Sequence, residues 1–163
     1  MGISVGDTLP DAALIKIGDE GPETVELATL AAGKKVVIFA VPGAYTPTCS
    51  SAHMPSFVRN AEALREAGVD EIVCVSVNDP FVMKAWATET HADQAEIHAL
   101  SDADGAFTKA IGMDFTAEPV GLLGRSKRYA MVVEDGKVTL FNAEENPGVC
   151  ELSAGETILE AMS

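Results

Sequence analysis

The chain has 163 residues, of which 47% are hydrophobic and 22% are charged. That length suits one compact domain over residues 1–163, because single domains cluster at roughly 100–200 residues. Eleven Lys and Arg residues stand against 25 Asp and Glu residues, which gives a formal net charge of -14. A surface of that sign repels phosphate groups, so nucleic acid and anionic membranes are excluded as expected partners.

The N-terminal residues carry no recognisable targeting signal. Residues 1–7 contain no basic region and no apolar stretch of signal length. The longest apolar run is 36–41, which is far shorter than the roughly 20 residues that span a bilayer. We therefore expect a soluble, cytoplasmic protein that does not enter the membrane.

Two short apolar runs, 36–41 and 72–77, are rich in β-branched residues and predict buried central strands. Between them, apolar residues recur at helical spacing over 57–67, and Gly68 ends that pattern. Pro55 lies inside the helical pattern, so we expect a kink in the second turn of the helix.

A second helix is predicted after the second strand. Asp79 has the position of an N-cap and Pro80 that of the first helical residue. The apolar side of this helix would carry Val82 and Trp86. A further short helix is expected over 106–111.

The C-terminal part predicts an antiparallel hairpin and a terminal helix. The segments 129–134 and 137–141 flank an Asp-Gly pair, which is typical of a two-residue hairpin turn. Ser153 and Glu156 have the spacing of a capping box for a helix that ends near Met162. This order of elements predicts an α/β protein with a mixed central sheet flanked by helices. A thioredoxin-like fold is the simplest such arrangement, and a flavodoxin-like sheet is the alternative.

The three cysteines, Cys49, Cys74 and Cys150, are too few and too scattered for the disulfide framework of a secreted protein. The chain has no C-x-x-C motif, because Ala52 stands three residues after Cys49. Cys49 and His53 have the spacing of metal ligands, but no second Cys/His pair accompanies them, and zinc needs three or four ligands. We therefore expect no metal site, which leaves reactive or buried thiols.

The most informative stretch, PGAYTPTCSSAH, occupies residues 42–53 between a predicted strand and a predicted helix. Free N–H groups and the helix dipole favour an anion at such a helix start, and for Cys49 that anion is its own thiolate. A thiol of ordinary pKa is only about 3% ionised at pH 7, and lowering its pKa by two units makes most of it reactive. Cys49 is therefore a candidate nucleophile; the alternative is a small buried hydrophobic residue.

Pro42, Thr46 and Cys49 form the pattern P-x-x-x-T-x-x-C, which resembles the active-site signature of the peroxiredoxins. The runs PGAYTPTCSSAHMPSF, IVCVSVNDPFVMKAW and RSKRYAMVVEDGKV are similar to the type II, or peroxiredoxin-5-like, subfamily. The resemblance covers nearly the whole chain. It implies a thioredoxin-fold peroxidase without metal or prosthetic cofactor, which reduces hydrogen peroxide and small organic hydroperoxides and forms a homodimer.

The same resemblance implies a role for each site residue. The Cys49 thiolate attacks a peroxide oxygen and becomes a sulfenic acid. The Thr46 hydroxyl bridges the sulfur and the peroxide, and Pro42 closes the pocket against water. Arg128 favours the thiolate and holds a peroxide oxygen. Arg125 is a second candidate that spacing alone does not separate from Arg128, and we interpret it as an interface or surface residue.

The remaining aromatic and imidazole side chains give weaker signals. His53 stands one helical turn beyond the candidate nucleophile, where a Cys–His hydrolase would carry its base. In the peroxiredoxins this histidine is not the base, so we expect a role in positioning or packing. His91 and His98 have no companion motif and are expected to be surface or core residues. Trp86 and Phe81 are interpreted as core or subunit contacts.

Two routes of recycling are considered for the oxidised cysteine. In the first, glutathione attacks the sulfenic acid, and glutathione or glutaredoxin clears the mixed disulfide, as in many bacterial members. In the second, Cys150 attacks within the same subunit, and thioredoxin reduces the Cys49–Cys150 disulfide. Animal members place a resolving cysteine near Cys150, but the preceding loop is shorter here, so we favour glutathione. Cys74 lies in a predicted buried strand and is interpreted as inert core. Because related plant proteins carry a cysteine in that block, where a resolving role is considered, Cys74 is the second resolving candidate after Cys150.

Two other classes of function remain as alternatives. A general thiol–disulfide oxidoreductase would reduce insulin, but the missing C-x-x-C motif argues against it. A non-enzymatic peroxide sensor would pass its oxidation to a partner protein and would recycle slowly. A peroxidase, by contrast, consumes reductant continuously when peroxide is supplied.

Overall fold

The computed structural model describes residues 2–48, 52–146 and 149–162. Within these ranges one sheet contains the strands β1 (Ala13–Gly18), β2 (Gly21–Glu26), β3 (Lys35–Ala40), β4 (Glu71–Ser76), β5 (Ile97–Ser101), β8 (Tyr129–Glu134) and β9 (Lys137–Ala143). A smaller sheet contains β6 (Asp114–Ala117) and β7 (Leu122–Ser126), joined by the 3-10 turn η2 (Glu118–Val120). The helices are α1 (Leu27–Ala31), α2 (Met54–Glu66), α3 (Pro80–Glu89), α4 (Ala106–Ala110) and α5 (Gly155–Ala161). None of the helices in the described ranges is long and apolar enough to cross a membrane.

The large sheet is mixed, with the strand order β2-β1-β5-β4-β3-β8-β9. Its centre, β5-β4-β3, is parallel, whereas β1 pairs antiparallel with β5 and β8 pairs antiparallel with β3. Parallel neighbours need crossover connections, and α2 and α3 supply them. An antiparallel β8-β9 pair beside the parallel strands is the thioredoxin-like arrangement. The flavodoxin-like alternative, whose sheet is parallel, is therefore wrong.

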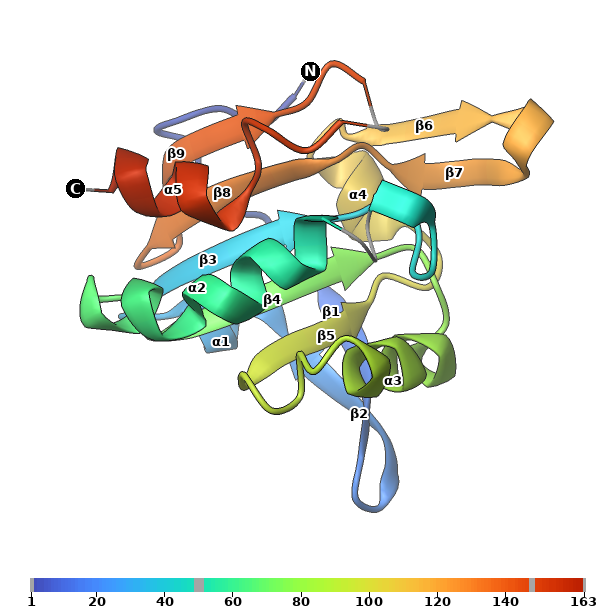
Figure 1. Ribbon diagram of the computed structural model, residues 1–163, viewed down its shortest axis with the longest axis horizontal. Coiled ribbons are helices and arrows are strands. Elements are labelled where there is room, and N and C mark those ends of the chain that lie inside the picture. The colour runs from blue at the N-terminus through green and yellow to red at the C-terminus, as the bar shows by residue number, and fades with distance from the viewer. Residues whose placement is uncertain (1, 49–51, 147–148, 163) are drawn as a thin grey trace.

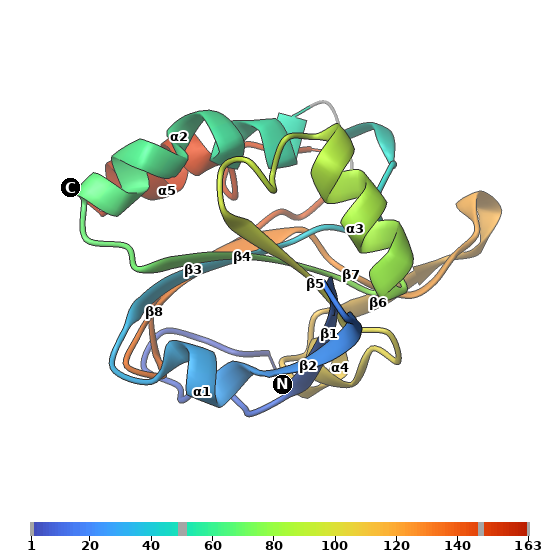
Figure 2. The ribbon, with the colours of Figure 1, turned by 90° about the horizontal axis from the view of Figure 1, so that it is seen from below.

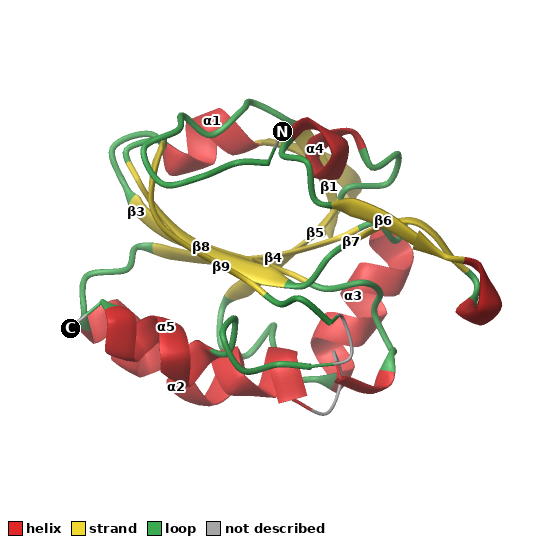
Figure 3. Ribbon diagram, turned by 90° about the horizontal axis from the view of Figure 1, so that it is seen from above, coloured by secondary structure: helices red, strands yellow, loops and turns green. Residues whose placement is uncertain are grey.

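Helices cover both faces of this sheet. In Figures 1 and 2, α2, α3 and α5 lie over one face, and the short helices α1 and α4 lie over the other. The small β6-β7 sheet projects away from the body, with η2 at its tip (Figure 3). The molecule thus has two apolar layers, one on each face of the large sheet, and one extended arm, which consists of β6, η2 and β7.

The central strands supply both layers because their side chains alternate between the two faces. In β3, Val37 and Phe39 belong to the apolar cluster that includes residues of α2, α3 and α5. Val36 and Ile38 belong to the opposite cluster, which includes residues of α1 and α4. Both predicted central strands are present, and each lies one residue earlier than expected.

Helix α2 differs from the expectation at its start. Residues 52–53 form a wider π-type turn, and the regular helix begins at Met54 with Pro55 in its first turn. The predicted kink in the second turn is therefore wrong. A first-turn N–H has no partner within the helix, so Pro55 removes no hydrogen bond there. Gly68 follows the helix with a φ of +106°, a conformation that suits glycine, and the predicted end is confirmed.

Helix α3 begins as predicted. The Asp79 carboxylate accepts a hydrogen bond from the Val82 N–H (2.8 Å), which confirms the N-cap. Val82 itself is half-buried, whereas Met83 and Trp86 are fully buried. Trp86 is thus a core residue. Helix α4 lies within the predicted range 106–111.

The β8-β9 hairpin is confirmed, and its turn residues Asp135 and Gly136 both have positive φ values, 48° and 80°. The predicted capping box of α5 is wrong. The N-cap is Ala154, and no side chain caps the helix. Ser153 binds Glu144 instead, while the Glu156 carboxylate accepts from Arg59 and Asn60 of α2.

Candidate active site

A cavity of about 430 Å³ lies between the turn that follows β3 and the projecting β6-β7 sheet. Its lining residues are Pro42, Thr46, Pro47, Thr48, Phe115, Ala117, Val120, Leu122 and Arg128. Three of the four predicted site residues, Pro42, Thr46 and Arg128, therefore meet at one cavity. The fourth, Cys49, lies outside the described residues, and Pro47 and Thr48, which precede it in the sequence, line this cavity.

The turn after β3 is held by Asn78, which follows β4. The Ala44 N–H donates to the Asn78 side-chain oxygen (2.9 Å), and the Ser76 hydroxyl donates to the same oxygen. The Thr46 hydroxyl donates to the Gly43 carbonyl (2.8 Å). Because that donation uses the hydroxyl proton, the Thr46 oxygen can accept a hydrogen bond from a hydroperoxide.

Position 43 is closely packed against the side chains of Arg125 and Thr46. A Cβ atom there would lie 2.9 Å from Nη1 of Arg125 and 3.3 Å from Cγ2 of Thr46. Arg125 is half-buried, and its Nη1 is 3.4 Å from the Pro42 carbonyl oxygen. Arg125 therefore contacts the backbone of the site, and its interface or surface role stays a prediction.

The Arg128 guanidinium is buried and is held by His53. Both side chains are almost inaccessible to solvent, with exposed fractions of 1% and 0%. Nη1 of Arg128 is 2.9 Å from Nδ1 of His53, and Nε2 of His53 is 3.0 Å from the Ser153 carbonyl oxygen. A guanidinium can only donate, so Nδ1 is the acceptor and Nε2 carries the proton. The two contacts fix one tautomer of the ring.

His53 remains neutral near pH 7. Burial, reinforced by the positive charge of Arg128, lowers the pKa of His53 from 6.5 to about 3, although the Ser153 carbonyl acts in the opposite direction. Its ring also packs against Phe39 and Phe57. With Nδ1 engaged by a guanidinium, His53 is unsuited to serve as the base of a Cys–His hydrolase. The contacts fit the expected positioning and packing role.

This environment predicts a loss of stability in mild acid. Unfolded His53 takes up a proton below about pH 6.5, whereas the folded ring resists protonation down to about pH 3. The unfolded state therefore binds protons first, and the free energy of unfolding is expected to fall by about 2 kcal/mol between pH 8 and pH 5. Urea unfolding curves at the two pH values measure the difference.

His53→Asn is the control for this prediction, because asparagine does not titrate in that range. Most of the pH dependence between pH 8 and pH 5 is expected to disappear in the variant. The lowered pKa values of Glu144 and Glu156 also reduce the free energy of unfolding as the pH falls. They do so only below about pH 4.5, the ordinary pKa of a glutamate. An equally steep loss in His53→Asn would contradict the assignment to His53.

The two other cysteines differ in accessibility. Cys74 is fully buried within β4, as predicted. Cys150 is half-buried, and burial raises the pKa of its thiol, while the charge of Arg128 and a hydrogen bond with Ser153 lower it. The net direction is upward, so Cys150 is a weaker nucleophile than an ordinary cysteine at neutral pH.

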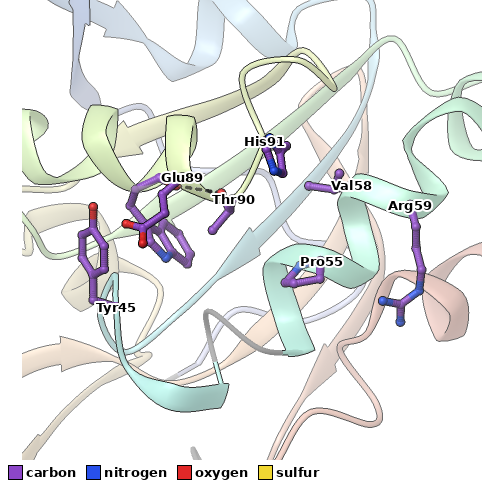
Figure 4. A pocket seen from close by; sticks show the side chains of 8 residues that line it. Tyr45, Pro55, Val58, Arg59, Glu89, Thr90 and His91 are labelled. Carbon is purple, nitrogen blue, oxygen red and sulfur yellow. Dashed lines mark hydrogen bonds between the residues drawn. The ribbon is translucent and has the colours of Figure 1, made fainter.

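The other predicted histidines lie away from this cavity. Nε2 of His98 is 3.2 Å from a Glu71 carboxylate oxygen, and His91 is exposed at a second cavity of about 680 Å³. Figure 4 shows this second cavity, whose lining comes mainly from α2 and α3 and includes Tyr45. Phe81 is 65% exposed, so it is not a core residue. No cluster of three or more potential metal ligands occurs in the part of the chain that the structure describes.

Sequence reasoning missed several residues that build the site. Asn78 stands directly before the predicted N-cap Asp79 and was given no role of its own, although a polar residue directly after a buried parallel strand is a typical site position. The apolar wall on β6 and β7, with Phe115 and Leu122, has no such signal, since the arm contains only short, half-buried strands. Glu144 had no local signal at all, because its partners are brought to it by the fold.

Comparisons with known proteins agree with this geometry. The protein-family profile described as Redoxin matches residues 4–159. Peroxiredoxin-2C of Oryza sativa subsp. japonica is 47% identical over 161 residues, covering 98% of each chain. The crystal structure of reduced Prx3 from Vibrio vulnificus in complex with H₂O₂ superposes with a TM-score of 0.90, at 48% identity and 99% coverage of each chain. Peroxiredoxin 5 from Alvinella pompejana gives a TM-score of 0.84 at 29% identity, covering 98% of this chain and 97% of that one.

These matches extend over almost the whole sequence, and at 44–47% identity the curated relatives are peroxiredoxins. The cavity brings together the Pro, Thr and Arg residues that the resemblance singled out. The chain therefore belongs to the peroxiredoxin family and is a thiol peroxidase with a thioredoxin-like fold.

Proposed function

We propose that this peroxiredoxin reduces hydrogen peroxide and small organic hydroperoxides at Cys49 and is recycled by glutathione and glutaredoxin. The observation that carries the proposal is the meeting of Pro42, Thr46 and Arg128 at one cavity, together with Thr48, the residue before Cys49. A buried guanidinium beside a cavity stabilises negative charge strongly, because little water screens it.

The proposed reaction begins with the Cys49 thiolate. Its sulfur attacks one peroxide oxygen, an S–O bond forms, and the O–O bond breaks. The attacked oxygen keeps its hydrogen, so the sulfur becomes a sulfenic acid, and the departing oxygen takes a proton from solvent and leaves as water or an alcohol. Arg128 would stabilise the charge as it shifts from sulfur to oxygen, and Thr46 would accept a hydrogen bond from the peroxide. Phe115, Val120 and Leu122 give the cavity an apolar wall that suits the carbon chain of an organic hydroperoxide.

Glutathione is favoured as the resolving thiol by the state of the chain's own cysteines. Cys74 is fully buried, and the raised pKa of Cys150 leaves little of its thiolate to attack a sulfenic acid. A small external thiol has neither restriction. It would attack the sulfenic acid, release water and leave a mixed disulfide, which a second glutathione or glutaredoxin then reduces.

A second candidate for the resolving step is Cys150 of the same subunit, followed by reduction of the disulfide by thioredoxin. The observation in its favour is that the charge of Arg128 acts on the Cys150 thiol and partly offsets burial. Cys150 therefore belongs to the electrostatic surroundings of the same guanidinium that lines the cavity.

Peroxide-driven consumption of NADPH tests the two routes. The wild type, Cys150→Ser and Cys74→Ser are compared with glutaredoxin, glutathione and glutathione reductase, and separately with thioredoxin and its reductase. With the glutathione system we expect all three proteins to turn over at similar rates. Loss of that turnover in Cys150→Ser would contradict the preference for glutathione, and a thioredoxin-driven cycle that depends on Cys150 would establish the second route.

The same assay addresses the non-enzymatic alternative. A peroxide sensor would consume about one equivalent of reductant for each oxidation that it passes on, and slowly, whereas a peroxidase consumes reductant for as long as peroxide is present. We expect a linear rate that is proportional to protein concentration. Trapped mixed disulfides with other proteins, without such a rate, would favour the sensor.

A homodimer is part of the proposal. Tyr45 and Phe81 are large apolar side chains with exposed fractions of 48% and 65%, and Tyr45 lines the hollow beside α3 in Figure 4. A second copy of the chain would cover these exposed side chains, since such residues are enriched at subunit interfaces. Sedimentation velocity of the intact protein is expected to give the mass of two chains, and a one-chain mass would rule this out.

A reducing, cytoplasmic setting is also proposed, because the mechanism needs Cys49 as a free thiol. Disulfides are rare in such compartments, where glutathione and thioredoxin keep thiols reduced. Both of the candidate electron donors belong to that environment. Fractionation of the source cells tests the location, and recovery of the protein outside the cytoplasmic fraction would count against it.

A further inference from the structure

Glu144 lies directly after β9 and is buried, with an exposed fraction of 7%. One of its carboxylate oxygens, Oε2, accepts three hydrogen bonds: from the Glu151 N–H (2.9 Å), the Ser153 N–H (2.7 Å) and the Ser153 hydroxyl (2.7 Å). Burial would raise the pKa of Glu144, but the hydrogen bonds from Ser153, Glu151 and Leu152 hold it below the ordinary value. The group is therefore an ionised carboxylate near pH 7.

These contacts belong to a closed circuit of hydrogen bonds. Ser153, bound by Glu144, offers its carbonyl to Nε2 of His53 (3.0 Å), and Nδ1 of His53 accepts from the Arg128 guanidinium (2.9 Å). The circuit closes through the backbone, because the Glu144 N–H donates to the Arg128 carbonyl (2.9 Å). Four residues, which stand directly after β9, directly before α2, shortly before α5 and directly before β8, are thus joined in one ring.

We propose that Glu144 is a positioning residue for Arg128, acting through Ser153 and His53. By binding both the N–H and the hydroxyl of Ser153, the carboxylate restricts the conformation of that residue. The Ser153 carbonyl thus stays aimed at His53, which keeps the proton on Nε2. Only that tautomer leaves Nδ1 able to accept from the guanidinium. The inference rests on the proposed function, since Arg128 matters here as the group that stabilises the Cys49 thiolate.

The position of Ser153 in the chain explains why its hydrogen bonds to Glu144 are needed. It stands just before the α5 N-cap Ala154, where no side chain caps the helix. Without the carboxylate, the hydroxyl and N–H of Ser153 would have to find other partners, and the peptide that carries the carbonyl would turn more freely. His53 would then sample the tautomer with its proton on Nδ1, which cannot accept a hydrogen bond from Arg128.

The first test measures the rate of Cys49 alkylation by iodoacetamide against pH. In Glu144→Ala we expect the midpoint of the profile to move upward by about one pH unit, and peroxide turnover at pH 7 to fall about threefold as the ionised fraction of Cys49 falls. Glu144→Gln keeps an oxygen at the same place and is expected to show a smaller shift in the same direction. An unchanged profile in a folded Glu144→Ala protein would overturn the inference.

Glu156→Ala is the matched control. Its carboxylate also makes side-chain hydrogen bonds between distant elements, to Arg59 and Asn60 of α2, but none of its contacts involves His53. If the effect of Glu144→Ala came only from losing hydrogen bonds between distant elements, it would therefore appear in this variant as well. We expect Glu156→Ala to have the wild-type pH profile, and a shift equal to that of Glu144→Ala would overturn the specific role.

The path is tested in a His53→Asn background. Asparagine keeps an acceptor near the position of Nδ1 but has no atom that reaches the Ser153 carbonyl, so the circuit is cut. Adding Glu144→Ala is expected to cause no further shift of the alkylation profile. A full additional shift would show that Glu144 acts by another route, and the proposed path would be wrong.

A spectroscopic measurement keeps the test independent of activity. The ¹⁵N chemical shifts of the His53 ring report its tautomer directly. We expect the Nε2–H form in the wild type and a mixture of tautomers in Glu144→Ala, or in Glu144→Gln to a smaller extent if the alanine variant does not fold. A pure Nε2–H form in a folded Glu144 variant would overturn the inference.

The two proposals fail in different ways. If the wild type shows no peroxide turnover, or if Cys49→Ser retains it, the proposed function is wrong. If turnover is normal and depends on Cys49, while Glu144→Ala changes neither the tautomer of His53 nor the alkylation profile, only the role of Glu144 is wrong.

Discussion

Cys49→Ser is expected to abolish peroxide-dependent oxidation of NADPH, with a loss of roughly 10³–10⁶-fold, as is found when a catalytic nucleophile is removed. A serine hydroxyl is not ionised at neutral pH, and its oxygen cannot form the sulfenic acid through which the reaction passes. The Pro42, Thr46 and Arg128 side chains that line the cavity would remain. They would provide a place for the peroxide but no atom that accepts its oxygen.

The measurement compares Cys49→Ser with Cys74→Ser and Cys150→Ser at equal protein concentration. The three substitutions make the same chemical change, one in the candidate nucleophile, one in the buried β4 and one at a half-buried site. Trapping of sulfenic acid by dimedone, followed by mass spectrometry, should label position 49 and no other. Turnover in Cys49→Ser at the wild-type rate would show that the chemistry takes place elsewhere.

The parts of the fold that were predicted from the sequence are those with strong local signals. The Asp135-Gly136 pair needs two positive φ values, and the segments beside it are β-branched, so the hairpin follows from neighbouring residues alone. The same holds for the Asp79 cap. The β2 strand, with the sequence GPETVE, was missed because an edge strand exposed to solvent lacks the apolar run or alternation that marks a strand.

The capping box failed because tertiary partners replaced local ones. Ser153 and Glu156 have the correct spacing, yet Ser153 binds Glu144, and Glu156 binds Arg59, 97 residues away in the sequence. A charged or hydroxyl side chain takes whichever partner the fold supplies, and spacing says nothing of distant partners. For the same reason the Glu144 circuit could not be inferred from the sequence.

The site was predicted as far as its residues share one motif. Pro42 and Thr46 lie in a single short segment, whereas Arg128 came from the resemblance, and spacing did not separate it from Arg125. The strand register distinguishes Arg128 from Arg125. Ala40, the last residue of β3, pairs with Tyr129, so Arg128 lies beside the chain as it leaves β3 for the Pro42 turn. Register is a long-range property, and only the folded sheet supplies it.

Arg128→Leu is expected to lower kcat/KM for hydrogen peroxide by about 10²–10³-fold, the loss typical of removing one donor that stabilises developing negative charge. The guanidinium is buried, lines the cavity and is fixed by His53, so its charge acts on the site with little screening. Arg128→Lys keeps the charge but not the forked donor geometry, and only part of the activity should return. Arg125→Leu, which alters a contact with the Pro42 carbonyl, is expected to cost less.

The pH dependence distinguishes an electrostatic role of Arg128 from a loss of packing. Without the guanidinium, the alkylation profile of Cys49 should move toward that of an ordinary thiol, while a packing defect alone would lower the rate without moving the midpoint. An Arg125 variant that lost more activity than Arg128→Leu would reverse the assignment of the two arginines.

The pKa of His53 reports independently on the positive charge of Arg128. The positive charge of Arg128 contributes to the low pKa of His53, although burial contributes more. In Arg128→Leu the pKa of His53 should therefore rise above about 3 while staying below its ordinary value. Since the folded ring then takes up a proton at a higher pH, the further loss of stability between about pH 5 and pH 3 should become shallower. An unchanged acid dependence in Arg128→Leu would mean that the guanidinium does not act on His53, and the electrostatic link between the two residues would have to be abandoned.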